Sequence, residues 1–315
     1  MRYGLPLIVV WIFVGFGCIG QSWYRIQDTE RKMGTTFSIT CYARDSIKAR
    51  ALISESWSRI DQLNLIFSNY LEESEAIKIS QAAGTNRWIT LSPEFSSVLK
   101  ESLKLSKLSE GAFDITIGPL SKLWRRAIRR GELPSDEMIM NTLRKVGFEK
   151  IQFDESTDRI RLLTTGMQLD FGGIAKGYTV DEVWRIFRDN GMTKVLIDAG
   201  GDIYAGEAPP GTEGWEIAVG DTQEILQIQN AAIAGSGDRF QFLTIDGRRY
   251  SHIIDPRIGK GVEGPRETYV ESESCMIADA LASTINIMGH EKANGLLQAY
   301  PSSALLSHKI FSGKD

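Results

Sequence analysis

The order of predicted strands and helices is the feature that most restricts how this chain can fold. Alternating apolar residues predict a series of strands in the C-terminal half, at 194–198, 203–205, 215–219, 225–229, 231–234, 240–245 and 249–254. The predicted helices are grouped between the runs of strands, and a final helical region covers 274–300. This arrangement indicates an α+β fold rather than a doubly wound parallel sheet. The sequence contains no fixed-period repeat or low-complexity linker, so one compact unit is expected.

The first half supplies most of the predicted helices. A strand is expected within 31–43, followed by a helix from Asp45 whose apolar residues recur at helical spacing. Ser92 and Pro93 predict the start of a second helix, which Gly111 ends. Two short strands, at 150–153 and 159–163, are expected to form a hairpin.

Composition excludes several classes of protein. The chain has 315 residues, of which 42% are hydrophobic, and a net charge of −4, so it is expected to be globular and not to have nucleic acid as its main partner. The basic residues clustered within 122–130 are interpreted as a solvated helix face.

The N-terminus differs in kind from the rest. Residues 4–20 are uncharged and mostly apolar, a length that suits a signal peptide better than a membrane span. Cys18 stands where a bacterial lipoprotein carries its acylated cysteine, although Gly15-Phe16 is a poor lipobox; cleavage after Gly20 and an uncleaved anchor are the alternatives. The predicted division is therefore 1–20 as export or anchor segment, 21–30 as short linker and 31–315 as globular domain.

Only Cys41 and Cys275 would remain in the mature chain. Two cysteines are too few for a disulfide framework, so we expect both to be small core residues.

The stretch 250–259 places an imidazole, a carboxylate and a guanidinium at the end of a strand, on His252, Asp255 and Arg257. Regular alternation would put His252 and Ile254 on one face. Pro256 lacks an amide hydrogen and forces an extended conformation on Asp255, which therefore lies on a rigid corner. The alternative is that His252 is an ordinary structural histidine.

Two other stretches could hold charged ligands. Around Leu169–Gly177 an acid, a glycine pair and Lys176 surround a helix start, which suits a phosphate, although a plain helix start is the alternative. Asp279 and Ser283 stand one helical turn apart, and their oxygens suit Mg²⁺ if other ligands join them. A solvent-facing polar pair is the alternative, which the apolar neighbours of Asp279 disfavour.

Several motifs occur in the order found in one known family. These are Met33-Gly34-Thr35, Ala112-Phe113-Asp114 with Gly118-Pro119-Leu120, Asp170 through Gly177, Gly200-Gly201-Asp202, Ser236-Gly237, His252 through Pro256 and Ala278-Asp279-Ala280-Leu281. Over about residues 31–300 the chain resembles ApbE-type flavin transferases, the FAD:protein FMN transferases. The resemblance implies an ApbE-like α+β fold of related β-α-β units and makes 31–315 the flavin transferase domain.

The resemblance also implies an activity. Such an enzyme uses Mg²⁺, takes FAD as substrate and moves FMN onto a Ser or Thr hydroxyl of a target protein, releasing AMP. The implied target carries a Ser/Thr-Gly-Ala-type motif and is a subunit of a membrane redox complex. The implied location is the periplasm, with attachment to the inner membrane through a lipid or the N-terminal anchor.

The family pattern assigns roles to individual residues. The residues that would line the FAD site are Met33, Tyr70, Ala112, Phe113, Asp114, Asp170, Lys176, His252 and Ile254. Gly173, through its carbonyl, would bind the metal with Asp279 and Ser283. His252 would orient or deprotonate the incoming hydroxyl, and Asp255 would support the corner.

The chain departs from the family pattern at four positions. Ser283, Gly235 and Ile258 each replace a frequent Thr, and Ser80 replaces a frequent Asn. Two other functions stay open at this point: an FAD pyrophosphatase that yields FMN and AMP, and a non-catalytic FAD-binding lipoprotein.

Overall fold

A computed structural model describes residues 22–220, 224–238, 242–245, 247–264 and 266–310. Its centre is a sheet in which every neighbouring pair of strands is antiparallel, in the order β1-β2-β6-β7-β10-β14-β15. The strands are β1 (Tyr24–Lys32), β2 (Thr35–Ala43), β6 (Val195–Ala199), β7 (Asp202–Ala205), β10 (Ala231–Gly237), β14 (Arg266–Ser272) and β15 (Ser303–Ile310). The expected α+β class is confirmed.

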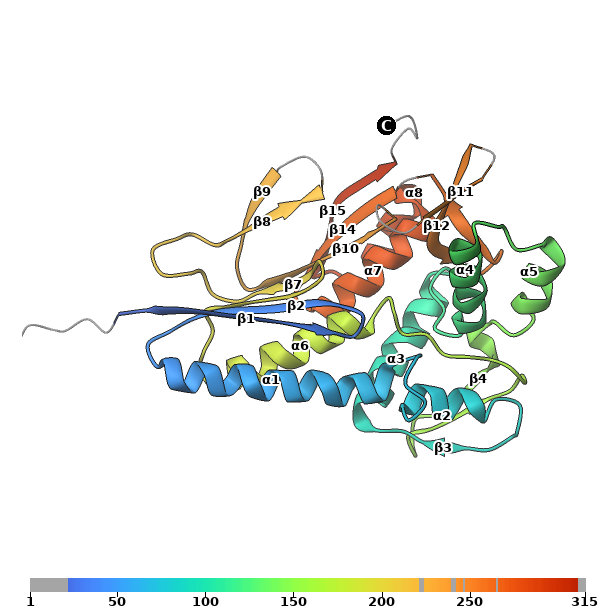
Figure 1. The fold of residues 1–315 in the computed structure, drawn as a ribbon, viewed down its shortest axis with the longest axis horizontal. Coiled ribbons are helices and arrows are strands. Elements are labelled where there is room, and N and C mark those ends of the chain that lie inside the picture. The colour runs from blue at the N-terminus through green and yellow to red at the C-terminus, as the bar shows by residue number, and fades with distance from the viewer. Residues whose placement is uncertain (1–21, 221–223, 239–241, 246, 265, 311–315) are drawn as a thin grey trace, which may run out of the picture.

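Three helices cover one face of this sheet: α1 (Ser46–Phe67), α6 (Ala175–Asp189) and α7 (Cys275–Met288) (Figure 1). Asp45 caps α1 by accepting hydrogen bonds from the amides of Ile47 and Lys48. The apolar stripe predicted for α1 is buried against β2, β6 and α6, and Trp57 and Ile60 belong to this core. The opposite face of the sheet packs against the hairpin of β8 (Trp215–Val219) and β9 (Glu224–Ile228).

The remaining elements form a second region beside the helical layer (Figure 1). Its helices are α2 (Glu75–Gln81), α3 (Pro93–Leu108), α4 (Gly118–Arg130) and α5 (Asp136–Leu143), and α8 (His290–Leu297) follows α7. Its strands are β3 (Ile89–Thr90), β4 (Ile151–Asp154), β5 (Arg159–Leu162), β11 (Phe242–Ile245), β12 (Arg248–Asp255) and β13 (Lys260–Glu263). An aromatic cluster joins the two regions, because Phe67 of α1 packs against Phe95 of α3 and Phe171 before α6.

Several expectations need correction. Most of the stretch expected as a linker, 21–30, lies in β1, which pairs with β2. β1 is an edge strand with Ile26 as its one buried residue, so it has no apolar alternation to detect. The pattern also missed α2, β13, β14 and β15.

The predicted export or anchor segment, 1–20 with Cys18, lies outside the described residues. Among the residues that the structure does describe, no helix is long and apolar enough to cross a membrane.

Close packing of α6 on α7 depends on Gly177. A β-carbon at this position would overlap the backbone carbonyl of Cys275, at the start of α7. We expect Gly177→Ala to lower the free energy of unfolding by about 2 kcal/mol, the usual scale for overpacking a core. Denaturant unfolding would measure this change.

Gly295→Ala is the matched control, because Gly295 is also helical and a β-carbon there would meet no atom within 4 Å. Alanine is a better helix former than glycine, so this variant should be as stable as the parent or more so. Equal stability of the two variants would contradict the close approach of α6 to α7 at Gly177.

Candidate active site

The strand-end corner is held by an ion pair within it. Asp255 accepts hydrogen bonds from three nitrogens of Arg257: the amide at 3.0 Å, Nε at 2.8 Å and Nη2 at 2.7 Å. The Asp255 carbonyl accepts a further bond of 2.8 Å from the amide of Gly259, whose φ of +69° suits the turn. These bonds use both carboxylate oxygens, which supports the corner-building role expected for Asp255.

His252 and Ile254 do not share an environment, contrary to the alternation argument. The pairing of β12 with β13 shifts register between Tyr250 and Ile254, which breaks the regular alternation. Ile254 is buried in a cluster with Leu120 and Trp124, whereas His252 is exposed. The side chain of His252 therefore lies at the surface, while a role of Ile254 toward FAD stays a prediction.

A chain of close neighbours leads from the corner to the predicted metal ligands. The position of a β-carbon on Gly111 lies 3.8 Å from Cγ of Arg257, so the loop before Ala112 adjoins the corner. A β-carbon added to Gly173 would likewise lie 3.7 Å from the Phe113 ring and 3.1 Å from Oγ of Ser283. Helix α7, which carries Ser283, also contacts β12 directly. The structure thus brings the predicted catalytic corner and the predicted metal site to one side of the molecule.

Two buried carboxylates and one ammonium group lie at the centre of the site. Lys176 pairs with Asp202, and its Nζ also lies 3.6 Å from Oδ2 of Asp279. Asp202 and Asp279 are 1% and 4% exposed. Burial raises the pKa of both carboxyls, and the charge of Lys176 opposes that rise. Burial by itself would lower the pKa of Lys176, but the two nearby carboxylates have the larger effect, so the pKa of Lys176 is raised.

Asp202 is a site residue that sequence reasoning did not single out. Its motif, Gly200-Gly201-Asp202, contributes to the family resemblance, but no role was assigned to the Asp202 carboxylate. A carboxylate placed directly after two glycines was the available signal; in the structure both glycines have positive φ, and Asp202 is the first residue of β7. What the sequence could not provide was its proximity to Lys176, which is 26 residues away.

The donor set fits a hard cation. Within the described ranges no three His, Cys, Asp or Glu side chains gather as a metal cluster, but the expected set needs only one carboxylate. Asp279 and Ser283 stand one turn apart on α7, and a β-carbon on Gly173 would lie 3.1 Å from Oγ of Ser283, so the absence of a side chain favours their close approach. Mg²⁺ binds few protein oxygens and keeps waters or substrate phosphate as its other ligands. These three residues are therefore suited to hold it.

A second group of predicted residues surrounds Arg125 of α4. Its Nη2 lies 2.9 Å from Oδ2 of Asp170, and its guanidinium lies 4.8 Å from the ring centroid of Tyr70. Asp170 also accepts a 3.0 Å bond from the amide of Gly172, which shapes the turn before α6. Tyr70 is 72% exposed, so its ring is accessible for stacking on a planar ligand.

The remaining predicted residues are more enclosed. Met33 has a φ of +49°, and its sulfur accepts a 3.4 Å hydrogen bond from Thr179 of α6. Ala112 is fully buried. Asp114 accepts bonds from the amide and hydroxyl of Thr116 and from the amide of Phe148, so it orders its own loop.

The structure accounts for two departures from the family pattern. Ser80 accepts a 3.0 Å hydrogen bond from the amide of Leu169 and so still supports the glycine-containing turn. A β-carbon on Gly235 would lie 2.7 Å from the ring of Tyr269 on the neighbouring strand, so glycine and that ring fit together. Ile258 is exposed, and nothing in the structure explains it.

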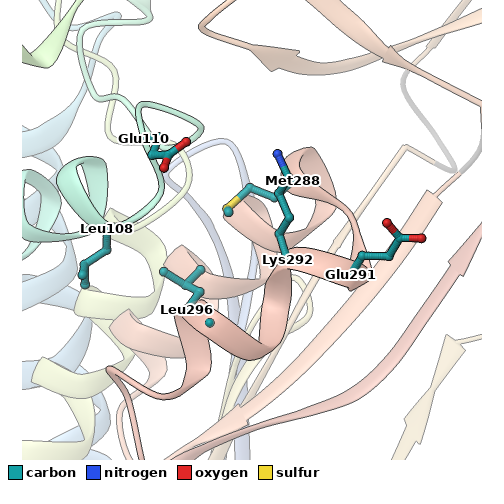
Figure 2. A pocket seen from close by; sticks show the side chains of 7 residues that line it. Leu108, Glu110, Met288, Glu291, Lys292 and Leu296 are labelled. Atoms are coloured by element: carbon teal, nitrogen blue, oxygen red, sulfur yellow. The ribbon is translucent and has the colours of Figure 1, made fainter.

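A cavity of about 420 Å³ opens beside the loop that precedes Ala112. Figure 2 shows Leu108 and Glu110 on one side of it and Met288, Lys292 and Leu296 on the other. Its size lies within the range of small-molecule sites. It therefore adds accessible volume next to the line of residues that joins the corner to Gly173.

The profile of the ApbE family matches residues 33–306, which include every predicted site residue. The chain belongs to the ApbE family. The resemblance inferred from the motifs is confirmed, and the names of the curated relatives described next show that the chain is a transferase.

Curated relatives of the chain carry one name. A protein of Vibrio cholerae named FAD:protein FMN transferase is 30% identical over 292 residues, covering 89% of this chain and 86% of the relative. A protein of Chlamydia muridarum with the same name is 32% identical over 244 residues, covering 76% and 75%.

Solved structures agree with the fold. A histidine-to-glycine mutant of the flavin transferase ApbE from Vibrio cholerae has a TM-score of 0.83 and 28% identity, covering 92% of this chain and 95% of that one. The apo form of the flavinyl transferase ApbE from Pseudomonas stutzeri has a TM-score of 0.80 and 27% identity, covering 93% of each chain. The expected ApbE-like architecture is confirmed.

Asp114 should make stability depend on pH. Burial raises the pKa of its carboxyl from 3.8 to about 6, although the bonds from Thr116 and Phe148 oppose the rise. Between these values the folded protein keeps a proton that the unfolded chain has lost, so its contribution to stability falls as pH rises. We expect the difference in unfolding free energy between the parent and Asp114→Asn to change by about 2 kcal/mol from pH 4 to 7. Denaturant titrations at several pH values would measure it, and parallel curves for the two proteins would contradict it.

Proposed function

We propose that the chain is a Mg²⁺-dependent FAD:protein FMN transferase that moves FMN from FAD to a Ser or Thr hydroxyl of a target protein. The name shared by its curated relatives supports this function. The observation that carries it for this chain is the continuous line of neighbours from Arg257 through Gly111 and Phe113 to Gly173 and Ser283. That line supports a single site formed by the exposed imidazole of His252, which precedes Arg257 on the same strand end, and the oxygen donors near Gly173.

In the proposed reaction, the oxygen of the acceptor hydroxyl attacks the phosphorus of the FMN half of FAD. A new bond forms between that oxygen and phosphorus, and the bond from the same phosphorus to the oxygen shared with AMP breaks. AMP leaves with the electron pair of the broken bond, and the acceptor loses its proton to a base. Positioning and stabilisation of charge supply most of the catalysis in such transfers.

His252 is the base in this proposal. It is exposed on β12, next to a corner that Asp255 and Arg257 make rigid. An imidazole titrates near neutral pH, so it can take the hydroxyl proton and return it to solvent. Its exposure suits a macromolecular acceptor, which must approach from outside.

The buried part of the site would hold the diphosphate. Lys176 supplies a positive charge that Asp202 keeps in place, and the amides at the start of α6 favour an anion. Arg125 and the exposed ring of Tyr70 offer a charge and a stacking surface beside Asp170. Bound by Asp279, Ser283 and the carbonyl of Gly173, Mg²⁺ would neutralise phosphate charge.

The acceptor and the location belong to the same proposal. The acceptor is a protein with a Ser/Thr-Gly-Ala-type motif, in a subunit of a membrane redox complex. The enzyme lies in the periplasm, attached to the inner membrane through lipid on Cys18 or through its N-terminal segment. The mass of the mature N-terminus distinguishes an acylated Cys18 from cleavage after Gly20.

FAD pyrophosphatase activity is the second candidate, because the same exposed corner admits water. The two functions differ only in the acceptor that reaches His252. A non-catalytic FAD-binding lipoprotein would leave FAD intact under all conditions.

An acceptor assay tests these functions together. We expect the protein with FAD and Mg²⁺ to attach FMN covalently to a peptide that carries the acceptor motif and to release one AMP per labelled peptide. His252→Ala should reduce this rate by roughly 10²–10⁴-fold, the usual contribution of a general base, while FAD affinity changes little. Peptide fluorescence and nucleotide chromatography would measure the products.

His290→Ala is the control, because it removes another exposed histidine, which belongs to α8 and not to the corner at the end of β12. Release of FMN without peptide labelling would favour the pyrophosphatase, and unchanged FAD would favour the binding protein. An equal loss of FAD affinity and transfer in His252→Ala would refute its role as base.

Metal binding has a readout that does not need activity. After treatment with EDTA, added Mg²⁺ should raise the unfolding temperature. At a Mg²⁺ concentration one hundred times Kd, the free energy of unfolding should rise by about 2.7 kcal/mol. Asp279→Asn should abolish the Mg²⁺-dependent shift, and Ser283→Ala should weaken it, whereas Ser283→Thr should keep it. Thermal scans at matched ionic strength would measure the shift; a full shift in Asp279→Asn would exclude this site.

A further inference from the structure

Helix α4 presents a row of basic side chains to solvent. Leu120, Trp124 and Ala127 face the core, and the opposite side carries Lys122, Arg126, Arg129 and Arg130, all of which are exposed. We call these four residues the basic face. It stands out because the whole chain has a net charge of −4.

No acidic side chain of the described residues neutralises the basic face. None of its four residues has a carboxylate oxygen within 4 Å in that part of the chain. The acidic residues that follow the helix are Glu132, Asp136 and Glu137, and Asp136 pairs instead with Lys260 at 3.1 Å. Four like charges on one helical face repel one another, so binding of an anionic partner would be electrostatically favourable.

Helix α4 packs against the catalytic corner with its apolar side, and Arg125 links the basic face to residues of the site. Trp124, on the buried side of α4, lies against Tyr250 and donates a 2.8 Å hydrogen bond to the carbonyl of Gly259, at the end of the catalytic corner. Arg125, between the two sides, contacts Asp170 and Tyr70. A macromolecule whose hydroxyl reaches His252 and that extends past Arg125 therefore meets the basic face.

We propose that the basic face is the docking surface for the acceptor protein and that it binds an acidic segment beside the acceptor hydroxyl. This inference rests on the proposed function. Charge complementarity of this kind raises the association rate and selects partners more than it strengthens the final complex. The basic face thus acts in acceptor choice and not in the chemical step.

The position of α4 favours a protein over anionic lipid as the occupant. In Figure 1, α4 lies at the opposite end of the long axis from Tyr24, where β1 begins. A membrane held by the proposed N-terminal anchor would meet the other end of the molecule. Lipid binding is therefore the competing outcome in the test.

The test uses the full chain and two peptides that share the acceptor motif, one flanked by glutamates and one by glutamines. The variant Lys122→Gln/Arg126→Gln/Arg129→Gln removes three charges and leaves Arg125 intact. We expect kcat/KM for the glutamate-flanked peptide to fall roughly tenfold with kcat unchanged, since exposed charge pairs are individually weak. The loss should shrink at high salt, and the glutamine-flanked peptide should be labelled equally by parent and variant.

Arg31→Gln/Arg50→Gln/Lys78→Gln is the matched control. It removes the same charge from exposed positions on β1, α1 and α2 that also form no ion pair in the described structure. This control should retain the parent's kcat/KM. Equal losses of kcat/KM in the two triple variants would show that only the net charge of the protein matters, and this result would overturn the proposal.

Direct binding separates failure of docking from failure of the proposed function. If the parent labels neither peptide, fluorescence anisotropy still compares their affinities, and tighter binding of the glutamate-flanked peptide that the basic-face variant loses supports docking. Equal affinities overturn it. So does a variant that loses binding to phosphatidylglycerol vesicles while it keeps its affinity for the acidic peptide.

Discussion

The contact of one ammonium group with two buried carboxylates is the interaction around which the site is built. Lys176 stands at the start of α6, Asp202 at the start of β7 and Asp279 within α7. Buried charges are strongly unfavourable unless they are paired, so the three elements must meet in one arrangement. Gly177 permits that meeting by letting α6 approach the first turn of α7.

The two regions of the molecule divide the chemistry of the site. The layer of helices on the main sheet supplies the buried charges and the oxygen donors. The region of α2 to α5 and β12 supplies exposed groups, including Tyr70 and His252. Phe113, against Gly173, joins the two. This division matches a reaction in which a diphosphate is held deeply and a protein acceptor approaches from solvent.

Three of the four departures from the family pattern are compatible with the interactions that support the site. A hydroxyl remains at Ser283, and Ser80 holds the amide of Leu169. Gly235 leaves space for Tyr269 on the next strand. Helix α4 combines two roles, because its apolar side braces the corner through Trp124 and its polar side carries Arg125 and the basic face.

The sequence by itself determined the α+β class, most helices and strands, and the family, because periodicity and ordered motifs are local properties of the chain. It could not find β1 or β15, since edge strands gain their stability from pairing and need no alternation. Tertiary structure alone decided that Asp202 joins Lys176, that a register shift separates the environments of His252 and Ile254, and that α4 lies beside the corner. These facts depend on contacts between distant residues, which no local pattern encodes.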